Sequence, residues 1–282
     1  MSEGKAVPAA VAGQGARNLL TRVAAALVLA PIAIAVAYAG SWWWIAPGTL
    51  VAIGLFVEWL TVVGSAREKS VIAAGVVALT VAGLCLGFAR VELALVALGL
   101  GAAATALLSS RQRGWTSGGF LYAGAAQMAS VVVRLDSATG FVALVFVMLI
   151  VWVTDIGGYF AGRGIGGAKL WPRVSPNKTW AGAIGGFGAS LVIALGFAAL
   201  DLGQAWPLLM LAAVLSVVAQ LGDLFESAVK RRFGVKDSSH IIPGHGGLMD
   251  RLDGFVAAIV LASIFGLLRG GVDGVGRGLM VW

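Results

Sequence analysis

Long apolar runs follow one another along almost the whole chain, and they restrict its fold more than any other feature. A helix needs about 20 apolar residues, with a range of roughly 17–25, to cross the hydrocarbon core of a bilayer. Runs of this length predict nine membrane-spanning helices, near residues 19–39, 43–63, 71–89, 92–108, 117–133, 140–161, 181–200, 206–229 and 250–268. No polar stretch is long enough for a separate soluble domain, so we expect an all-α, polytopic membrane helix bundle.

The composition agrees with a membrane protein. Hydrophobic residues make up 59% of the chain and charged residues 12%, whereas soluble domains have about 25% charged residues. The 41 glycines suit helices that pack closely in lipid. The single cysteine, Cys85, lies in an apolar run, which excludes a disulfide framework and a cysteine metal site. The net charge of +7 orients a membrane protein and attracts anionic head groups, so we expect no nucleic-acid partner.

The Lys and Arg residues are distributed unevenly between the two ends of the predicted spans. All of them except Arg90, Arg134, Arg269 and Arg277 fall in the N-terminus or at the loops after the second, fourth, sixth and eighth spans. Loops rich in Lys and Arg stay in the cytoplasm, so we predict a cytoplasmic N-terminus and an external C-terminus. The first apolar run is too long for a removed signal peptide and shows no evident small-residue cleavage site, so it should remain as a span.

The N-terminal half carries few groups that suggest chemistry. Residues 1–18 are polar and small and are expected to be a disordered cytoplasmic N-terminus, and a scaffold of five helices is expected over 19–133. Glu58 lies inside the second span beside Trp59. Two interpretations of Glu58 stay open: a carboxyl that is hydrogen-bonded between helices or reaches the nearby interface, and a member of the functional site.

Charge is concentrated between Ser227 and Asp253. Ionised side chains at membrane depth cost about 2.5–3.5 kcal/mol each on insertion scales, so their default interpretation is functional. We expect a hairpin at the membrane edge whose ends re-enter the apolar phase with Asp223 and Glu226 on one side and Asp250 and Asp253 on the other. The stretch contains five cations, three aspartates and both histidines of the chain: Lys230, Arg231, Arg232, Lys236, Arg251, Asp237, Asp250, Asp253, His240 and His245.

Two further segments upstream favour a polar site. Asp155, Tyr159 and Gly162 follow one another at helical spacings of four and three, so they share one helix face that leads into Arg163. The glycine-rich run 162–167 is similar to a phosphate loop, but no strand is expected before it, so alone it is a weak indication. We therefore interpret Asp155 and Tyr159 as residues that line a site.

The segment after the sixth span has the pattern of a helix start. Ser175 is a suitable N-cap and Pro176 a suitable first helical residue. A helix beginning here would present free backbone N–H groups and the positive end of its dipole, which together form a ready anion site. Lys178 and Thr179 would add a charge and a hydroxyl to it. The alternative is a capped helix with a lysine that only reaches the interface.

Three blocks of residues together resemble one known family. The order Ser227-x-Val229-Lys230-Arg231, then Lys236-Asp237, then Pro243-x-His245-Gly246-Gly247-Leu248-x-Asp250-Arg251-Leu252-Asp253 is similar to the signature of the phosphatidate cytidylyltransferases, also called CDP-diacylglycerol synthases. The Asp-x-x-x-Tyr-x-x-Gly-Arg run from Asp155 and the Ser-Pro-x-Lys-Thr-Trp run from Ser175 resemble the upstream blocks of the same family. Two positions depart from it: Ala181 stands for the usual Glu, and Gly167-Ala168 for Gly-Lys, which shifts the lysine role to Lys169.

The resemblance implies transfer of the cytidylyl group of CTP to phosphatidate, with CDP-diacylglycerol and pyrophosphate as products. Phosphatidate brings its own anionic oxygen nucleophile, so the barrier is mainly anion repulsion and charge on the leaving group, which metal ions and cationic side chains reduce. The catalytic residues implied are Asp223, Lys230, Arg231, Lys236, His245, Asp250, Arg251 and Asp253. The substrate-binding residues implied are Asp155, Tyr159, Arg163, Lys169, Ser175, Lys178, Thr179, Ser227, Asp237, Gly246 and Gly247.

Some of these assignments keep an alternative. Asp223, Asp250 and Asp253 are oxygen ligands of the type that suits Mg²⁺, and a second cation such as K⁺ is left open. Arg232 is interpreted as an ordinary cytoplasmic charge. His245 is expected to bind a phosphate or to orient Asp250, with a structural role at the interface as the alternative.

The expected setting follows from the same observations. We predict a multi-pass protein of the cell (inner) membrane whose active site faces the cytoplasm, with the catalytic region over 134–282 and cytoplasmic loops at 162–180 and 230–249. CTP, phosphatidate and membrane lipid are the expected partners, and a homodimer is left open. The alternatives are a CTP-dependent polyprenol or lipid kinase and a cation-coupled transporter. A transporter would place binding residues in both halves, whereas the charge here is concentrated after residue 150.

Overall fold

The computed structural model describes residues 27–239 and 246–282. The predicted disordered N-terminus over 1–18 and both histidines, His240 and His245, lie outside the described residues.

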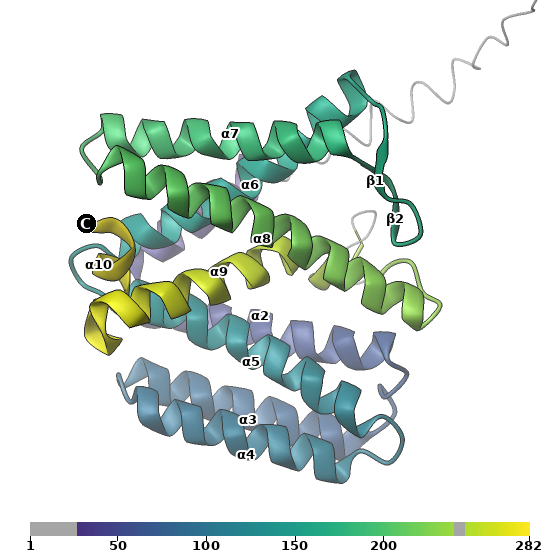
Figure 1. Cartoon of the computed structure of the whole chain (residues 1–282). Coiled ribbons are helices and arrows are strands. Elements are labelled where there is room, and N and C mark those ends of the chain that lie inside the picture. Colours follow the sequence, from purple (N-terminus) through teal and green to yellow (C-terminus); the bar gives the residue numbers. More distant parts are fainter. Residues whose placement is uncertain (1–26, 240–245) are drawn as a thin grey trace, which may run out of the picture.

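The described chain is a bundle of long helices (Figure 1). A helix at Leu27–Ala39 comes first. It is followed by α2 (Ser41–Val62), α3 (Lys69–Gly87), α4 (Val91–Leu108), α5 (Arg113–Leu135), α6 (Gly140–Gly164), α7 (Trp180–Ala199), α8 (Ala205–Arg232), α9 (Met249–Gly270), a 3₁₀ turn (Val272–Gly274) and α10 (Val275–Met280).

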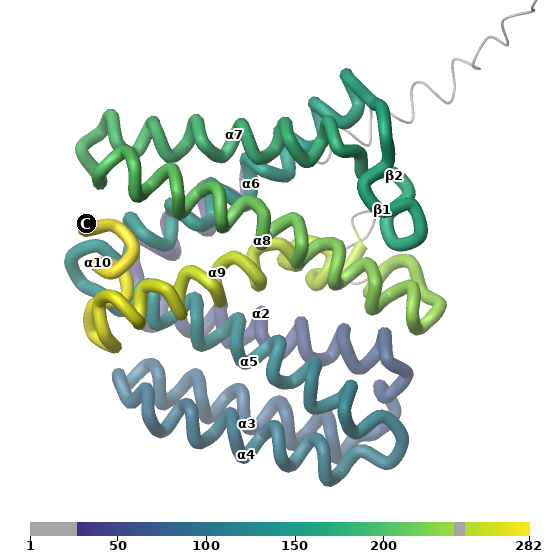
Figure 2. Tube along the Cα trace, viewed as in Figure 1, coloured from purple at the N-terminus to yellow at the C-terminus, as the bar shows by residue number. Residues whose placement is uncertain are grey.

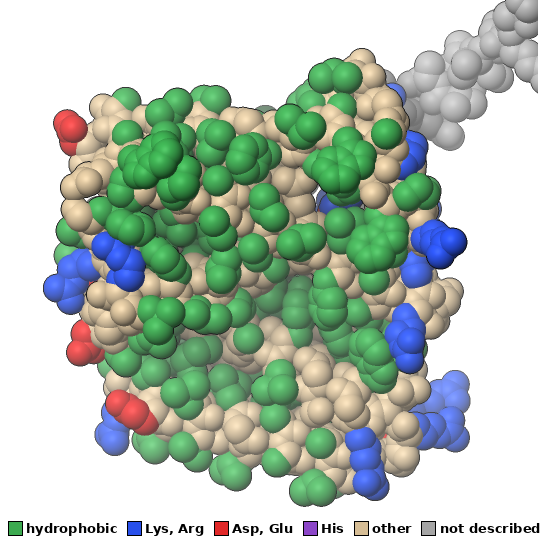
Figure 3. All heavy atoms as spheres, in the orientation of Figure 1, with side chains coloured by type: hydrophobic (Ala, Val, Ile, Leu, Met, Phe, Trp, Pro, Cys, Tyr) green, Lys and Arg blue, Asp and Glu red, His purple; other side chains and the backbone are tan. Residues whose placement is uncertain are grey.

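Seven helices of the described ranges are long and apolar enough to cross a membrane: α2, α3, α4, α6, α7, α8 and α9. The expected all-α, polytopic membrane architecture is thereby confirmed. The count of nine spans and the side of the N-terminus stay predictions. In Figure 3, hydrophobic side chains cover most of the visible helical face, while Lys and Arg gather at its edges, chiefly at the edge that carries β1 and β2 in Figure 1.

Two apolar clusters hold the bundle together, and α9 belongs to both. One cluster is centred on Phe146 and Ile150 of α6 and includes Ile259 of α9. The other is centred on Phe56 of α2 and includes Met249 at the start of α9. Figure 2 shows α9 passing between α8 and α5, and it packs against both. The start of α9 is therefore fixed by the N-terminal half of the chain as well as by the C-terminal half.

Glycines bring α6 and α7 into close contact. A Cβ added at Gly186 of α7 would lie 2.4 Å from the backbone oxygen of Thr154, and one added at Gly157 of α6 would lie 2.8 Å from the Cβ of Ala189. Both distances are shorter than van der Waals contact, so only glycine permits this approach. The close packing holds the polar face of α6 next to the segment that enters α7.

That segment is a β-hairpin, which corrects one prediction. Strands β1 (Lys169–Trp171) and β2 (Ser175–Thr179) pair antiparallel. The prediction that Ser175 caps a helix beginning at Pro176 is wrong, because these residues belong to β2. Helix α7 begins at Trp180, and the Thr179 hydroxyl caps it by accepting a hydrogen bond from the backbone N–H of Gly182 at 3.1 Å. Where a helix start was expected, the backbone instead forms hydrogen bonds across the pair of strands β1 and β2.

Candidate functional site

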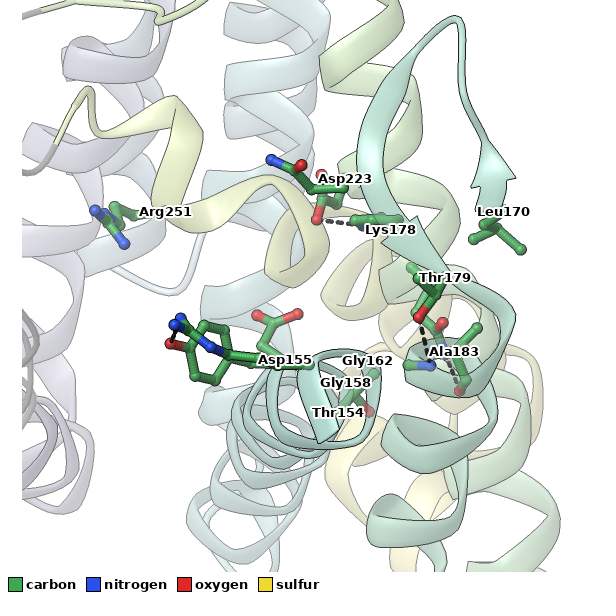
Figure 4. Close-up of a pocket in the computed structure, with 15 residues that line it drawn as sticks. Thr154, Asp155, Gly158, Gly162, Leu170, Lys178, Thr179, Ala183, Asp223 and Arg251 are labelled. Atoms are coloured by element: carbon green, nitrogen blue, oxygen red, sulfur yellow. Dashed lines mark hydrogen bonds and ion pairs between the residues drawn. The ribbon is translucent and has the colours of Figure 1, made fainter. Parts of the chain in front are cut away.

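A polar pocket of about 670 Å³ lies between α6, the β-hairpin, α7, α8 and α9. Its lining includes Asp155, Tyr159, Arg163, Lys178, Asp223 and Arg251. Figure 4 shows the Asp155 and Asp223 side chains pointing into the same space, with Lys178 beside Asp223 and Arg251 across from them. Helix α6, the β-hairpin, α8 and α9 thus bring both signs of charge to one cavity at the edge of an apolar bundle.

Lys178 and Asp223 form an ion pair across this pocket. Each side chain keeps 28% of its surface exposed, so the pair is open to solvent and to a ligand. The Ser227 hydroxyl lies one helical turn further along α8 and donates to Asp223 Oδ1 at 3.4 Å. The predicted phosphate-binding lysine and one predicted metal ligand are therefore direct neighbours.

The predicted shared face of α6 is present in the pocket. Asp155, Tyr159, Gly162 and Arg163 all belong to its lining. The Arg163 guanidinium donates to the Tyr159 hydroxyl at 2.9 Å and lies over the same ring, 5.9 Å from its centroid. This contact orients a cation at the rim of the pocket, where an anionic ligand would meet it.

A second charged network, around Lys230, is more buried than the Lys178–Asp223 pair. The ammonium of Lys230 contacts Glu226 Oε2 at 2.6 Å and forms an ion pair with Asp250 Oδ1. The other oxygen of Asp250 accepts from Gly247 N at 2.8 Å and from Ser238 N and Ser238 Oγ at 3.1 Å each. Both oxygens of Asp250 therefore have partners within the protein, and Lys230 is buried, with 8% of its surface exposed.

Glu58 joins this network from the opposite half of the chain. It is fully buried. Its Oε1 accepts from Ser239 Oγ at 2.6 Å and from Leu248 N at 2.8 Å, and its Oε2 accepts from Met249 N at 2.7 Å. Oε2 also lies 3.0 Å from Ser238 Oγ, whose single proton is shared between Glu58 and Asp250. The interpretation of Glu58 as an internally hydrogen-bonded carboxyl is confirmed. The sequence signal was a lone carboxylate inside an apolar span, but its partners are about 180 residues away.

Other predicted residues lie apart from the pocket. Lys169, Arg231, Lys236 and Asp237 are exposed to solvent in this structure. Arg231 donates to the backbone oxygen of Val235 at 3.1 Å, a local contact at the end of α8. Lys169 entered the candidate set because Gly167-Ala168 departs from the family's Gly-Lys, and the other three entered through the signature. The contribution of all four to a site stays a prediction.

The predicted metal ligands do not form a closed carboxylate cage. Among the described residues, no group of three His, Cys, Asp or Glu side chains is placed to hold a metal ion. Asp223 and Asp250 each pair with a lysine. Mg²⁺, however, is commonly held by one or two carboxylates together with substrate phosphates. Asp155 and Asp223, which face one pocket, fit that kind of site, and Mg²⁺ itself stays a prediction.

An apolar cleft lies on the other side of α8. It has a volume of about 370 Å³ and is lined by Tyr122, Leu221, Phe225 and Val256, with Asp253 as its carboxylate. An adjacent hollow of about 310 Å³ shares Tyr122 and Phe225 and adds two tryptophans, Trp59 and Trp115. Asp253 thus connects an apolar cleft with the helix turn that also carries Asp250 and Arg251.

Comparison with known proteins agrees with the geometry. The chain matches the model of the cytidylyltransferase family over residues 20–268. It is 40% identical over 256 residues to a phosphatidate cytidylyltransferase of Brucella suis, covering 89% of this chain and 94% of that protein. It is 49% identical over 123 residues to a phosphatidate cytidylyltransferase of Staphylococcus saprophyticus, covering 43% of this chain and 47% of that protein. The family match covers most of the chain, so the chain belongs to the cytidylyltransferase family.

Proposed function

We propose that the protein transfers the cytidylyl group of CTP to phosphatidate and releases CDP-diacylglycerol and pyrophosphate. The relatives at 40% identity carry the name of this activity. The observation that carries the proposal is the polar pocket, which combines Lys178, Arg163 and Arg251 with two carboxylates in a membrane helix bundle. A volume of about 670 Å³ falls within the usual range of roughly 300–1,000 Å³ for ligand pockets.

The chemistry requires charge stabilisation more than a protein nucleophile. A phosphate oxygen of phosphatidate forms a bond to the α-phosphorus of CTP, the bond from that phosphorus to the oxygen bridging to the β-phosphate breaks, and the electron pair leaves with pyrophosphate. Lys178 and Arg163, which line the pocket, would hold the CTP phosphates and reduce repulsion between the two anions. Arg251 faces the same pocket from α9.

Mg²⁺ is the cofactor that we propose for the pocket. Its oxygen preference fits Asp155 and Asp223, which would hold it together with the CTP phosphates. When bound, Mg²⁺ supplies positive charge to the phosphates. Asp223 also has a role without it, because its ion pair fixes the position of the Lys178 ammonium.

The lipid substrate has a complementary place in the bundle. The cleft lined by Tyr122, Leu221 and Phe225 is apolar, so it suits an acyl chain better than a nucleotide. We propose that an acyl chain of phosphatidate lies there while its phosphate reaches toward Arg251 of the polar pocket. We further propose that the pocket opens to the cytoplasm of the cell membrane, because CTP is a cytoplasmic substrate.

Labelled CTP separates this proposal from its alternatives. Purified protein is incubated with phosphatidate and CTP labelled at the α- or the γ-phosphate, with and without Mg²⁺. We expect the α-label in the lipid fraction and the γ-label in pyrophosphate, with little transfer after chelation. The γ-label in a lipid would indicate a kinase, and neither label in lipid would contradict cytidylyl transfer.

A further inference from the structure

Glu58 stands apart from the groups so far assigned to the reaction. It lies on α2, whereas the polar pocket is built by α6, the β-hairpin, α7, α8 and α9. Yet all four hydrogen bonds that its carboxylate accepts from described residues come from Ser238, Ser239, Leu248 and Met249. These donors flank the start of the helix that carries Asp250, Arg251 and Asp253 at its beginning.

Two of these donors are backbone N–H groups at the start of α9. The first N–H groups of a helix have no partner within the helix, and Leu248, the N-cap residue of α9, makes no capping bond with its own side chain. The Glu58 carboxylate accepts from Leu248 N and Met249 N at 2.8 and 2.7 Å. A negative charge is also favourable at the positive end of the helix dipole. A residue of α2 thus caps α9.

One hydroxyl connects Glu58 to Asp250. Ser238 Oγ lies 3.0 Å from Glu58 Oε2 and 3.1 Å from Asp250 Oδ2. Ser238 is buried, with 3% of its surface exposed. A displacement of Glu58 is therefore transmitted to Asp250 both through this hydroxyl and through the helix start.

The packing at Gly247 leaves no space for a side chain. A Cβ added at Gly247 would lie 1.9 Å from Ser238 Oγ and 2.6 Å from Glu58 Oε2. The glycine in the signature is thus required because Ser238 and Glu58 occupy the space that a side chain would need. Such a site has little room to relax when one group changes.

We propose that Glu58 is a positioning residue of the reaction, which holds the first turn of α9 and, through Ser238, the Asp250 carboxylate in their working geometry. The proposal rests on the proposed function, because the first turn of α9 carries Arg251, which lines the polar pocket. Glu58 makes no contact with the polar pocket among the described residues, so its effect is indirect. The proposal therefore predicts that α2, which carries Glu58, is needed for turnover as well as for folding.

The test replaces one acceptor oxygen of Glu58. In Glu58→Gln, either orientation of the amide places an NH₂ group against a backbone N–H, Leu248 N or Met249 N, which then loses its acceptor. Glu92→Gln is the matched control, because Glu92 is exposed at the start of α4. Folded protein is isolated by size exclusion, and kcat and KM are measured for CDP-diacylglycerol formation well below the Tm of each variant.

We expect kcat per folded molecule to fall by about 10- to 100-fold in Glu58→Gln, the size of effect caused by small misplacements of reacting groups. Ser238→Ala should also lower kcat, and the double variant should be at most about threefold below the worse single variant, because the two changes break one connected network. Glu92→Gln should match the wild type.

Two outcomes would overturn the proposal. One is a kcat of folded Glu58→Gln within twofold of Glu92→Gln, which would make Glu58 a purely structural residue whose loss lowers only Tm. The other is multiplication of the two single losses in the double variant. If Glu58→Gln does not fold, the kcat of Ser238→Ala is the test. An unchanged kcat in that variant would contradict the proposed link between Glu58 and Asp250. Failure of the proposed function is distinguishable, because then the wild type itself forms no product.

Discussion

Replacing Lys230 by Met removes the cation that pairs with both Glu226 and Asp250 in a buried network, while keeping most of the side-chain volume. The Lys230 side chain is 10% exposed, and its partners Glu226 and Asp250 are 1% and 14% exposed. Removing one partner of a buried ion pair costs about 3–5 kcal/mol, because an uncompensated charge stays buried. Here two carboxylates lose their cation at once. We therefore expect a loss of stability at the upper end of that range.

The assay is thermal unfolding in detergent, followed by the fraction of monodisperse protein. At roughly 2–4 °C per kcal/mol for a chain of this size class, Lys230→Met should lower Tm by about 10–20 °C. Lys178→Met is the matched control, since it breaks a lysine–aspartate pair whose side chains are 28% exposed. Exposed pairs contribute about 0–1 kcal/mol, so this control should lower Tm by a few degrees at most.

A rescue experiment separates charge from packing. Adding Glu226→Gln and Asp250→Asn to Lys230→Met neutralises the stranded carboxylates, and the triple variant should regain most of the lost Tm. If Lys230→Met and Lys178→Met shift Tm equally, or if the triple variant is less stable than Lys230→Met, the reasoning from burial is refuted.

Three further predictions concern packing, pH and topology. Gly186→Ala should destabilise the protein by about 1–3 kcal/mol, because its Cβ would lie 2.4 Å from Thr154 O. Gly188→Ala is the control, because a Cβ added there has no heavy atom within 4 Å. Equal Tm values for the two variants would contradict the close packing. Burial alone would raise the pKa of Asp136, which lies between α5 and α6, but three backbone N–H donors outweigh it and lower that pKa. Its stabilisation is therefore present above the ordinary aspartate pKa of about 3.9 and is lost as pH falls through the folded value, so acid unfolding of Asp136→Asn should depend less on pH than that of the wild type. A reporter after Trp282 should be external and one in the β-hairpin cytoplasmic, and reporters on the same side would show that the predicted count of spans is wrong.

The membrane architecture was predictable because it depends on local composition. A run of about 20 apolar residues specifies a span wherever it occurs, so the helix ranges could be located without knowing any contact. The face that carries Asp155 and Tyr159 was predictable for a similar reason, since helical spacing alone places them together. Both now line one pocket.

The features that the sequence did not reveal depend on pairing between distant segments. Ser175 and Pro176 have the residue types of a helix start, but they belong to strand β2, which pairs with β1. Helix α7 therefore begins only at Trp180. Local preference gave way to hydrogen bonds formed across the hairpin. The capping of α9 by Glu58 was equally hidden, because hydropathy identifies the span but says nothing of which distant N–H groups its carboxylate meets.

The site residues were found largely through the signature. The structure then separates those that line the polar pocket from those in the network around Lys230. Asp250 and Asp253 lie three residues apart on one helix, which suggested a shared metal. In the structure Asp250 is engaged with Lys230 and Ser238, whereas Asp223 faces Lys178 in the polar pocket. The spacing of residues shows which side chains are neighbours on the same helix. It does not show which side chains from other segments of the chain each aspartate will pair with.

The most direct test of the account is the selectivity of Lys178→Ala for one substrate. If the Lys178 ammonium binds the CTP phosphates in the polar pocket, its loss removes a charge-assisted contact of about 1.5–3 kcal/mol. The KM for CTP should then rise about 10- to 100-fold, the KM for phosphatidate should stay within about twofold of the wild type, and the exposed control Lys69→Ala should change neither. An equal rise for both substrates, or no rise for CTP in folded protein, would contradict the placement of CTP in this pocket.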